Sequence, residues 1–124
     1  MIFPTASTKE IFALAKEYVE LFEKYDFKNI VVSIKGSNVI DTIKANQLFA
    51  ESFNYPIHLG ITEAGTKDIS LIRSSAGLSP LLLSGIGDTI RVSLTADPVE
   101  EIYAAKSILS SLNLSNGGAK LVSC

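Results

Sequence analysis

Apolar positions in this chain follow two alternating periods. Three short, largely apolar runs predict β-strands, at residues 29–35, 56–63 and 88–94. Segments with apolar residues near a 3.6-residue period predict helices between and around them, at residues 8–25, 38–53, 66–84 and 97–112. Residues 119–124 could add a further short strand. This order predicts parallel strands joined by right-handed helical crossovers.

Capping residues predict where three of the helices start. Ser7 precedes the first helix, Ser37 or Asn38 can cap the second, and Asp97 followed by Pro98 opens the last. The helix at residues 66–84 is expected to break near residues 77–80, because proline is costly inside a helix. A second short helix would then start there.

Each predicted strand carries a charge where an apolar residue would pack better. Lys35, Glu63 and Arg91 occupy these positions, and successive charges are 28 residues apart. A charge in a strand buried on both faces costs several kcal/mol unless it is paired or meets a charged ligand. The even spacing predicts that the three groups lie at matching depths and share one polar site.

Two α/β architectures fit this element order: a small open sheet, or a contiguous piece of a (β/α)₈ TIM-type barrel. The two-residue strand period favours the barrel piece. It puts Ser33 and Lys35 on one face, and Thr89, Arg91 and Ser93 on one face. Polar inward groups near the ends of strands are typical of a barrel mouth.

The candidate chemistry is anion binding. Arg91 offers a planar fork for phosphate oxygens, and Lys35 a compact point charge. Hydroxyl groups of Thr89 and Ser93 could add hydrogen bonds, and Glu63 could act as an acid or base. A structural ionic cluster of Glu63 with the two cations fits the spacing equally well. His58, at the start of its strand, is interpreted as structural and far from the mouth.

Composition narrows the class of protein. The chain has 124 residues, which suits one domain, and a net charge of −2, which predicts no strong attraction to nucleic acid or an anionic membrane. No apolar run approaches the ~20 residues of a membrane span. The first residues lack a signal-peptide pattern, and Cys124 is the only cysteine, so a reducing cytoplasm is expected.

Three blocks of sequence resemble successive signatures of one enzyme family. They are Val32-Ser-Ile-Lys-Gly-Ser37, His58-Leu-Gly-Ile-Thr-Glu-Ala-Gly65 and Gly85-Ile-Gly-Asp-Thr-Ile-Arg-Val-Ser-Leu-Thr-Ala-Asp-Pro-Val-Glu-Glu101. The family is the bacterial 4-hydroxy-3-methylbut-2-enyl diphosphate synthase, or GcpE, of the methylerythritol phosphate route to isoprenoids. The resemblance runs from about residue 13 to the last residue.

This resemblance implies a (β/α)₈ barrel followed by a [4Fe–4S] domain. The family reductively opens 2-C-methyl-D-erythritol 2,4-cyclodiphosphate, with ferredoxin or flavodoxin as the electron donor. The family's substrate-contacting lysine falls on Lys35, its active-site glutamate on Glu63, and its diphosphate-binding arginine and serine on Arg91 and Ser93. Cys124 would be the first cluster ligand. Residues 1–118 would hold barrel strands six to eight, and residues 119–124 the start of the iron–sulfur domain.

The chain also departs from the family pattern. Asn38 stands where the family usually has Asp, Pro80 departs from the usual helix, and a [4Fe–4S] cluster needs about four ligands against one cysteine here. We therefore expect a partial enzyme chain that is inactive alone, assembles no cluster and self-associates through exposed strand edges. The alternative is a non-catalytic α/β module for anion binding or protein interaction.

Overall fold

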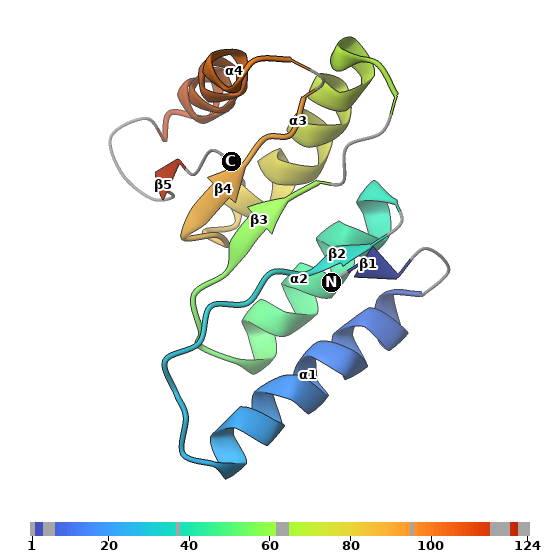
Figure 1. The fold of residues 1–124 in the computed structure, drawn as a ribbon, viewed down its shortest axis with the longest axis vertical. Coiled ribbons are helices and arrows are strands. Elements are labelled where there is room, and N and C mark those ends of the chain that lie inside the picture. The colour runs from blue at the N-terminus through green and yellow to red at the C-terminus, as the bar shows by residue number, and fades with distance from the viewer. Residues whose placement is uncertain are drawn as a thin grey trace.

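Short strands alternate with helices along the chain in the computed structural model (Figure 1). The structure describes residues 2–3, 7–36, 38–61, 65–94, 96–114 and 120–121. The strands are β1 (Ile2–Phe3), β2 (Lys35–Gly36), β3 (His58–Gly60), β4 (Thr89–Arg91) and β5 (Lys120–Leu121). The helices are α1 (Thr8–Lys24), α2 (Val39–Ser52), α3 (Lys67–Leu83) and α4 (Pro98–Ser111). The predicted α/β class is confirmed, and so is the predicted alternation from α1 onward, whereas β1 was not predicted.

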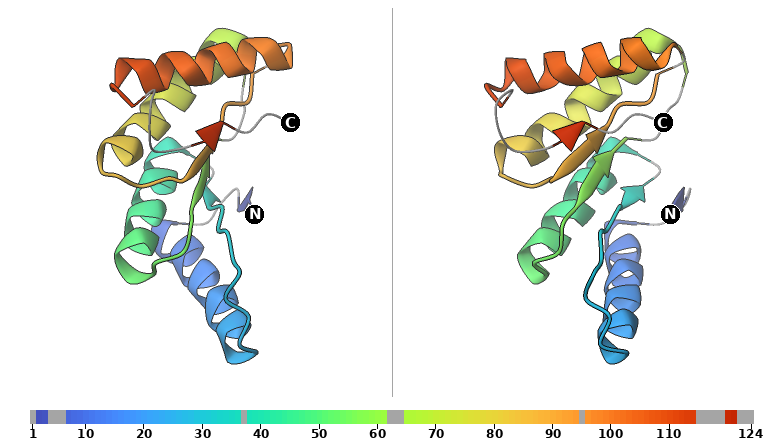
Figure 2. Two further views of the ribbon diagram at one scale, coloured as in Figure 1. Left: turned by 90° about the vertical axis from the view of Figure 1, so that its left-hand side faces the viewer. Right: turned by 60° about the vertical axis from the view of Figure 1, so that its left-hand side comes forward.

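Strands pair in chain order, and every pairing is parallel. β1 pairs with β2, and β3, β4 and β5 form a second small sheet. Among the described residues, one parallel bridge, between Val32 and Ile57, joins the two groups. Consecutive helices pack against each other, and the strands lie along one side of α2 and α3 (Figure 2). The chain is therefore a row of βα units whose helices cover one face.

Two polar side chains of α2 take the place of strand pairing at the end of β2. The backbone N–H of Gly36 donates to Thr42 Oγ1 at 2.8 Å, and Asn46 Nδ2 donates to the carbonyl oxygen of Ile34 at 3.2 Å. Both side chains are buried. These backbone groups are therefore satisfied without β3, which explains why pairing between β2 and β3 stops at one bridge.

Two of the predicted helix caps are confirmed in full. Ser7 caps α1, and Asn38 caps α2 by accepting a 2.8 Å hydrogen bond from the N–H of Asp41. Asp97 occupies the N-cap of α4 with Pro98 after it, but its carboxylate makes no capping hydrogen bond. The start of α4 therefore depends on the backbone preference of proline at the first helical position.

The predicted break in the third helix is wrong. α3 runs without interruption from Lys67 to Leu83, with Pro80 inside it. Pro80 lies in the last turn, and its missing N–H removes one helical hydrogen bond, to the carbonyl four residues earlier. The residue one turn earlier, Ala76, is exposed, so its carbonyl can be hydrated instead. Gly77 lies on the buried face of the same turn and packs against Ile61.

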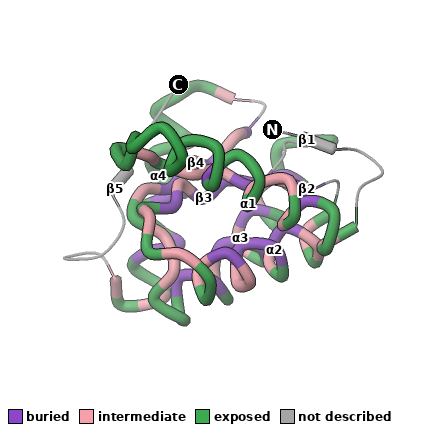
Figure 3. The backbone as a smooth tube through the Cα atoms, turned by 90° about the horizontal axis from the view of Figure 1, so that it is seen from below, coloured by how far each residue is buried: buried purple, intermediate pink, exposed green. Residues whose placement is uncertain are grey.

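A hydrocarbon core fills the space between the strands and the helices. Phe49 of α2, Leu78 and Leu81 of α3, and Ile90 of β4 are completely buried. Figure 3 shows buried residues on the sides of α2, α3 and the strands that face one another. Within the described ranges, no helix is both long and apolar enough to cross a membrane.

Polar contacts hold the first turns of α1 and α2 together. Thr8 Oγ1 donates to Asp41 Oδ1 at 2.6 Å, and Asn38 Nδ2 donates to Asp41 Oδ2 at 2.8 Å. The Thr8 hydrogen bond, followed by that from Asn38, lowers the pKa of Asp41 below its ordinary value. The contact fixes α1 beside α2 at the end of β2, where the candidate site begins.

Candidate anion-binding site

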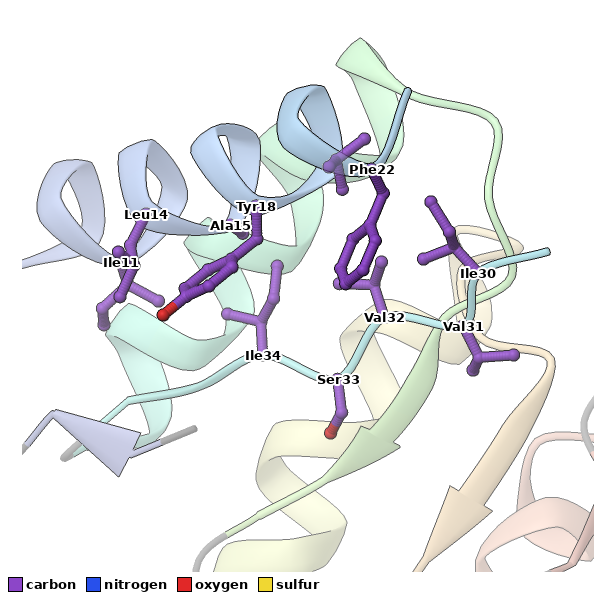
Figure 4. Close-up of a pocket in the computed structure, with 11 residues that line it drawn as sticks. Ile11, Leu14, Ala15, Tyr18, Phe22, Ile30, Val31, Val32, Ser33 and Ile34 are labelled. Carbon is purple, nitrogen blue, oxygen red and sulfur yellow. The ribbon is translucent and has the colours of Figure 1, made fainter. Parts of the chain in front are cut away.

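Side chains of the segment that leads into β2 alternate between the helices and the opposite face. Val32 and Ile34 point toward α1, whereas Ser33 points away from it (Figure 4). Lys35 follows Ser33 by two residues and so shares its face. The face that the helices leave uncovered, here called the inner face, thus begins with a hydroxyl and an ammonium group.

Lys35, Gly60 and Arg91 form one row across three neighbouring strands. Gly60 is directly opposite Arg91 in the β3–β4 pairing. Lys35 and Gly60 each come three residues after the bridged pair of Val32 and Ile57, which puts them opposite each other. A Cβ atom on Gly60 would lie 3.2 Å from Lys35 Cε and 3.4 Å from Lys35 Nζ. The lysine side chain therefore lies over Gly60, toward the strand of Arg91.

A second row of polar residues lies beneath the two cations. His58 is opposite Thr89, and His58 Nδ1 is 2.6 Å from Thr89 Oγ1. Burial, followed by the charges of Lys35 and Arg91, lowers the pKa of His58 below its ordinary value. The imidazole is therefore neutral at pH 7, and the inner face keeps the two positive charges of the row above.

Arg91 and Ser93 share the inner face at the end of β4. Val92 and Leu94, on either side of Ser93, are buried toward the core, so Ser93 faces the same way as Arg91. Arg91 Nε is buried and has no hydrogen-bond partner among the described residues. A buried donor of this kind calls for an acceptor. Anionic oxygen is the acceptor that a guanidinium binds most strongly.

The structure brings together Lys35, Arg91 and Ser93, three of the five predicted site residues. Glu63 and Cys124 lie outside the described residues. Lys35 and Arg91 lie in one row, at matching depth, whereas the depth of Glu63 stays a prediction.

The position predicted for His58, far from the mouth, is wrong. His58 lies one row below the cations, and the charges of Lys35 and Arg91 lower its pKa. Its interpretation as a structural residue agrees with its hydrogen bond to Thr89, which uses the hydroxyl proposed for phosphate binding. His58 and Thr89 come two residues before Gly60 and Arg91 on the same strands, so the two pairs share one face. The strand period could therefore have revealed it.

A cavity among the described residues lies away from the cationic row. A groove of ≈ 300 Å³ runs between α1 and the segment before β2 (Figure 4). Its lining is almost entirely apolar: Ile11, Leu14, Ala15, Tyr18, Val19, Phe22, Ile30, Val31, Val32, Ser33 and Ile34. It lies on the helix side of the strands, so it is separate from the cationic row and unsuited to an anion.

Parallel βα units in chain order, with polar groups on the inner face at strand ends, define a TIM-barrel type of domain. The sequence model described as the GcpE TIM-barrel domain matches residues 3–106. The chain belongs to the GcpE family.

Similar proteins agree with this assignment. A protein of Clostridium tetani is 53% identical over 110 residues, which are 89% of this chain and 32% of that protein. A protein of Mycoplasmoides gallisepticum is 48% identical over 122 residues, 98% of this chain and 34% of that protein. A protein of Thermotoga maritima is 47% identical over 116 residues, which are 94% of this chain and 33% of that protein. All three are named 4-hydroxy-3-methylbut-2-en-1-yl diphosphate synthase (flavodoxin), and the chain spans about a third of their length.

Proposed function

We propose that this chain forms one wall of the substrate site of a 4-hydroxy-3-methylbut-2-enyl diphosphate synthase, from barrel strands six to eight. The substrate would be 2-C-methyl-D-erythritol 2,4-cyclodiphosphate, which the complete enzyme opens reductively in the cytoplasm. The observation that carries this proposal is the row in which Lys35 lies over Gly60 toward Arg91. Two cations at one level suit an anion with two phosphoryl groups.

Each residue has a distinct proposed role. Arg91 binds phosphoryl oxygens with its planar fork, and Lys35 adds a point charge at the same level. Ser93, two residues beyond Arg91 on the same face, donates a hydroxyl hydrogen bond to the diphosphate. Glu63, three residues after Gly60, is proposed to face the reacting carbon atoms as an acid, a base or a hydrogen-bond acceptor.

The iron–sulfur cluster of the complete enzyme does not fit on this chain alone. A [4Fe–4S] cluster needs about four protein ligands, and the sequence has one cysteine, Cys124, which we propose as a ligand at the start of a second domain. In the described ranges, no group of three His, Cys, Asp or Glu residues is placed to hold a metal ion. Electrons from flavodoxin or ferredoxin would thus have no acceptor here, and we propose binding without turnover.

Titration calorimetry of the 124-residue chain with inorganic pyrophosphate and with the cyclodiphosphate tests this function. Lys35→Ala and Arg91→Ala should each weaken binding about 10- to 100-fold, because each removes a hydrogen bond to a charged group worth about 1.5–3 kcal/mol. Lys106→Ala, which removes an exposed cation of α4, is the matched control and should change affinity little. Failure of the unchanged chain to bind either ligand would refute the anion site and favour the interaction module.

We also propose that the chain self-associates. Val31 and Phe22 at the mouth of the apolar groove are exposed at 66% and 44%, and Tyr18 and Leu21 are comparably exposed. Exposed apolar area of this kind invites association. Light scattering over a concentration series should show a mass that rises with concentration, and Val31→Lys should reduce that rise. A constant monomer mass at the highest concentration would contradict the proposal.

A further inference from the structure

We propose that Gly60 is a positioning residue of the anion site, whose missing side chain leaves the space through which Lys35 reaches across β3 toward Arg91. This inference rests on the proposed function for its consequence in binding. The geometry behind it does not depend on any ligand. We therefore expect the affinity for a diphosphate to depend on Gly60, a residue with no functional group.

The backbone gives no other reason for glycine at this position. Glycine is favoured where φ is positive, as it is at Gly65, Gly85 and Gly87. Gly60 is not among the residues with positive φ, and it lies in the regular parallel pairing of β3 with β4. A β-branched residue would suit such a buried strand better. Glycine here therefore reflects space and not backbone conformation.

That space is filled by the lysine. The nearest atoms to a Cβ on Gly60 would be Lys35 Cε at 3.2 Å and Nζ at 3.4 Å, ahead of the carbonyl oxygen of Arg91 at 3.6 Å. A methyl group would have to push the end of the lysine aside by a few tenths of an ångström. A valine would occupy the path of the side chain outright. The height of the ammonium above β3 thus depends on residue 60.

The electrostatics of the row below agree with this placement of the ammonium. Lys35 and Arg91, on strands either side of β3, both lower the pKa of His58. Their effect on one imidazole puts both charges over the same part of the inner face. An anion with two phosphoryl groups could contact both cations at this level. Displacing Lys35 would remove one of the two contacts such an anion uses.

A double-mutant cycle between residues 35 and 60 tests the inference. The variants are Gly60→Val, Gly60→Ala, Lys35→Ala and the Gly60→Val/Lys35→Ala pair, with Lys106→Ala as a control on α4. Calorimetry with pyrophosphate gives the affinity. We expect Gly60→Val to weaken binding about tenfold, Gly60→Ala less, and Lys35→Ala to cost almost nothing further once residue 60 is valine.

The His58 titration gives a readout that needs no ligand. His58 is the only histidine of the chain, so its imidazole signals in NMR spectra are unambiguous. Lys35→Ala should raise the pKa of His58 when residue 60 is glycine, because a nearby positive charge is lost. The same substitution should change that pKa little when residue 60 is valine. Valine itself buries His58 further and so changes its pKa. This effect cancels when the variant with Lys35→Ala is compared with its own parent in each background.

The two readouts separate the possible failures. If pyrophosphate does not bind the unchanged chain, the proposed function is refuted. The His58 pKa values of the four variants in the cycle then decide the role of Gly60. If Lys35→Ala raises the pKa of His58 equally in both backgrounds, the positioning role is overturned. Independent losses of affinity in the cycle would overturn it as well. Should Gly60→Val fail to fold, Gly60→Ala completes the cycle with smaller effects of the same sign.

Discussion

Phe49→Ala is expected to remove about 3–5 kcal/mol from the free energy of unfolding. Phe49 of α2 is fully buried, and its ring stacks on Phe53 with a centroid separation of 4.9 Å. The substitution loses the transfer free energy of the ring and leaves a cavity between α2 and the strands. Since domains of this size are stable by about 5–15 kcal/mol, the loss is a large part of the total.

Urea unfolding followed by far-ultraviolet circular dichroism measures this loss. Phe27→Ala provides the matched control, because Phe27 is 52% exposed and its ring is already largely hydrated. It should cost less than about 1 kcal/mol. Equal losses for the two variants would show that α2 does not anchor the core as its burial indicates.

Helices were the most predictable part of this fold, because their starts depend on local chemistry. Ser7 and Asn38 accept hydrogen bonds from backbone N–H groups a few residues later, so their roles can be recognised without knowing the rest of the chain. Pro80 misled the same local reasoning. The free-energy cost of a proline depends on where the helix ends and on which face of the helix is exposed to solvent. Tertiary packing decides both.

The extent of strand pairing, in contrast, could not be predicted from spacing. The face that carries Lys35, Arg91 and Ser93 followed from the two-residue period of strands. The extent of pairing between β2 and β3 did not, because the side chains of Thr42 and Asn46 in α2 form hydrogen bonds with the backbone at residues 36 and 34. The role of a missing side chain at Gly60 is also invisible in a pattern of polar and apolar residues. It emerges only when Lys35 is placed above it.

Gly77→Val is expected to destabilise the chain by about 3 kcal/mol, although glycine is a poor helix former. Replacing glycine inside α3 would gain less than about 1 kcal/mol of helix propensity. Against this, a Cβ on Gly77 would lie 2.3 Å from Ile61 Cδ1 and 2.6 Å from Ile61 Cγ1. Both residues are buried, so relief requires Ile61 to leave its rotamer or α3 to move away from the end of β3. Overpacking of this kind costs about 1–3 kcal/mol or more.

Combining Gly77→Val with Ile61→Ala separates overpacking from a general intolerance of change in α3. The pair removes from Ile61 as many carbon atoms as it adds at Gly77, so the volume of the interface is conserved. Alone, Ile61→Ala should cost about 2–5 kcal/mol through the cavity it leaves. Urea unfolding of the double variant should therefore show a loss well below the sum of the two single losses. Additive losses would mean that the two side chains do not compete for one space, and the close approach of α3 to the strand would need another cause.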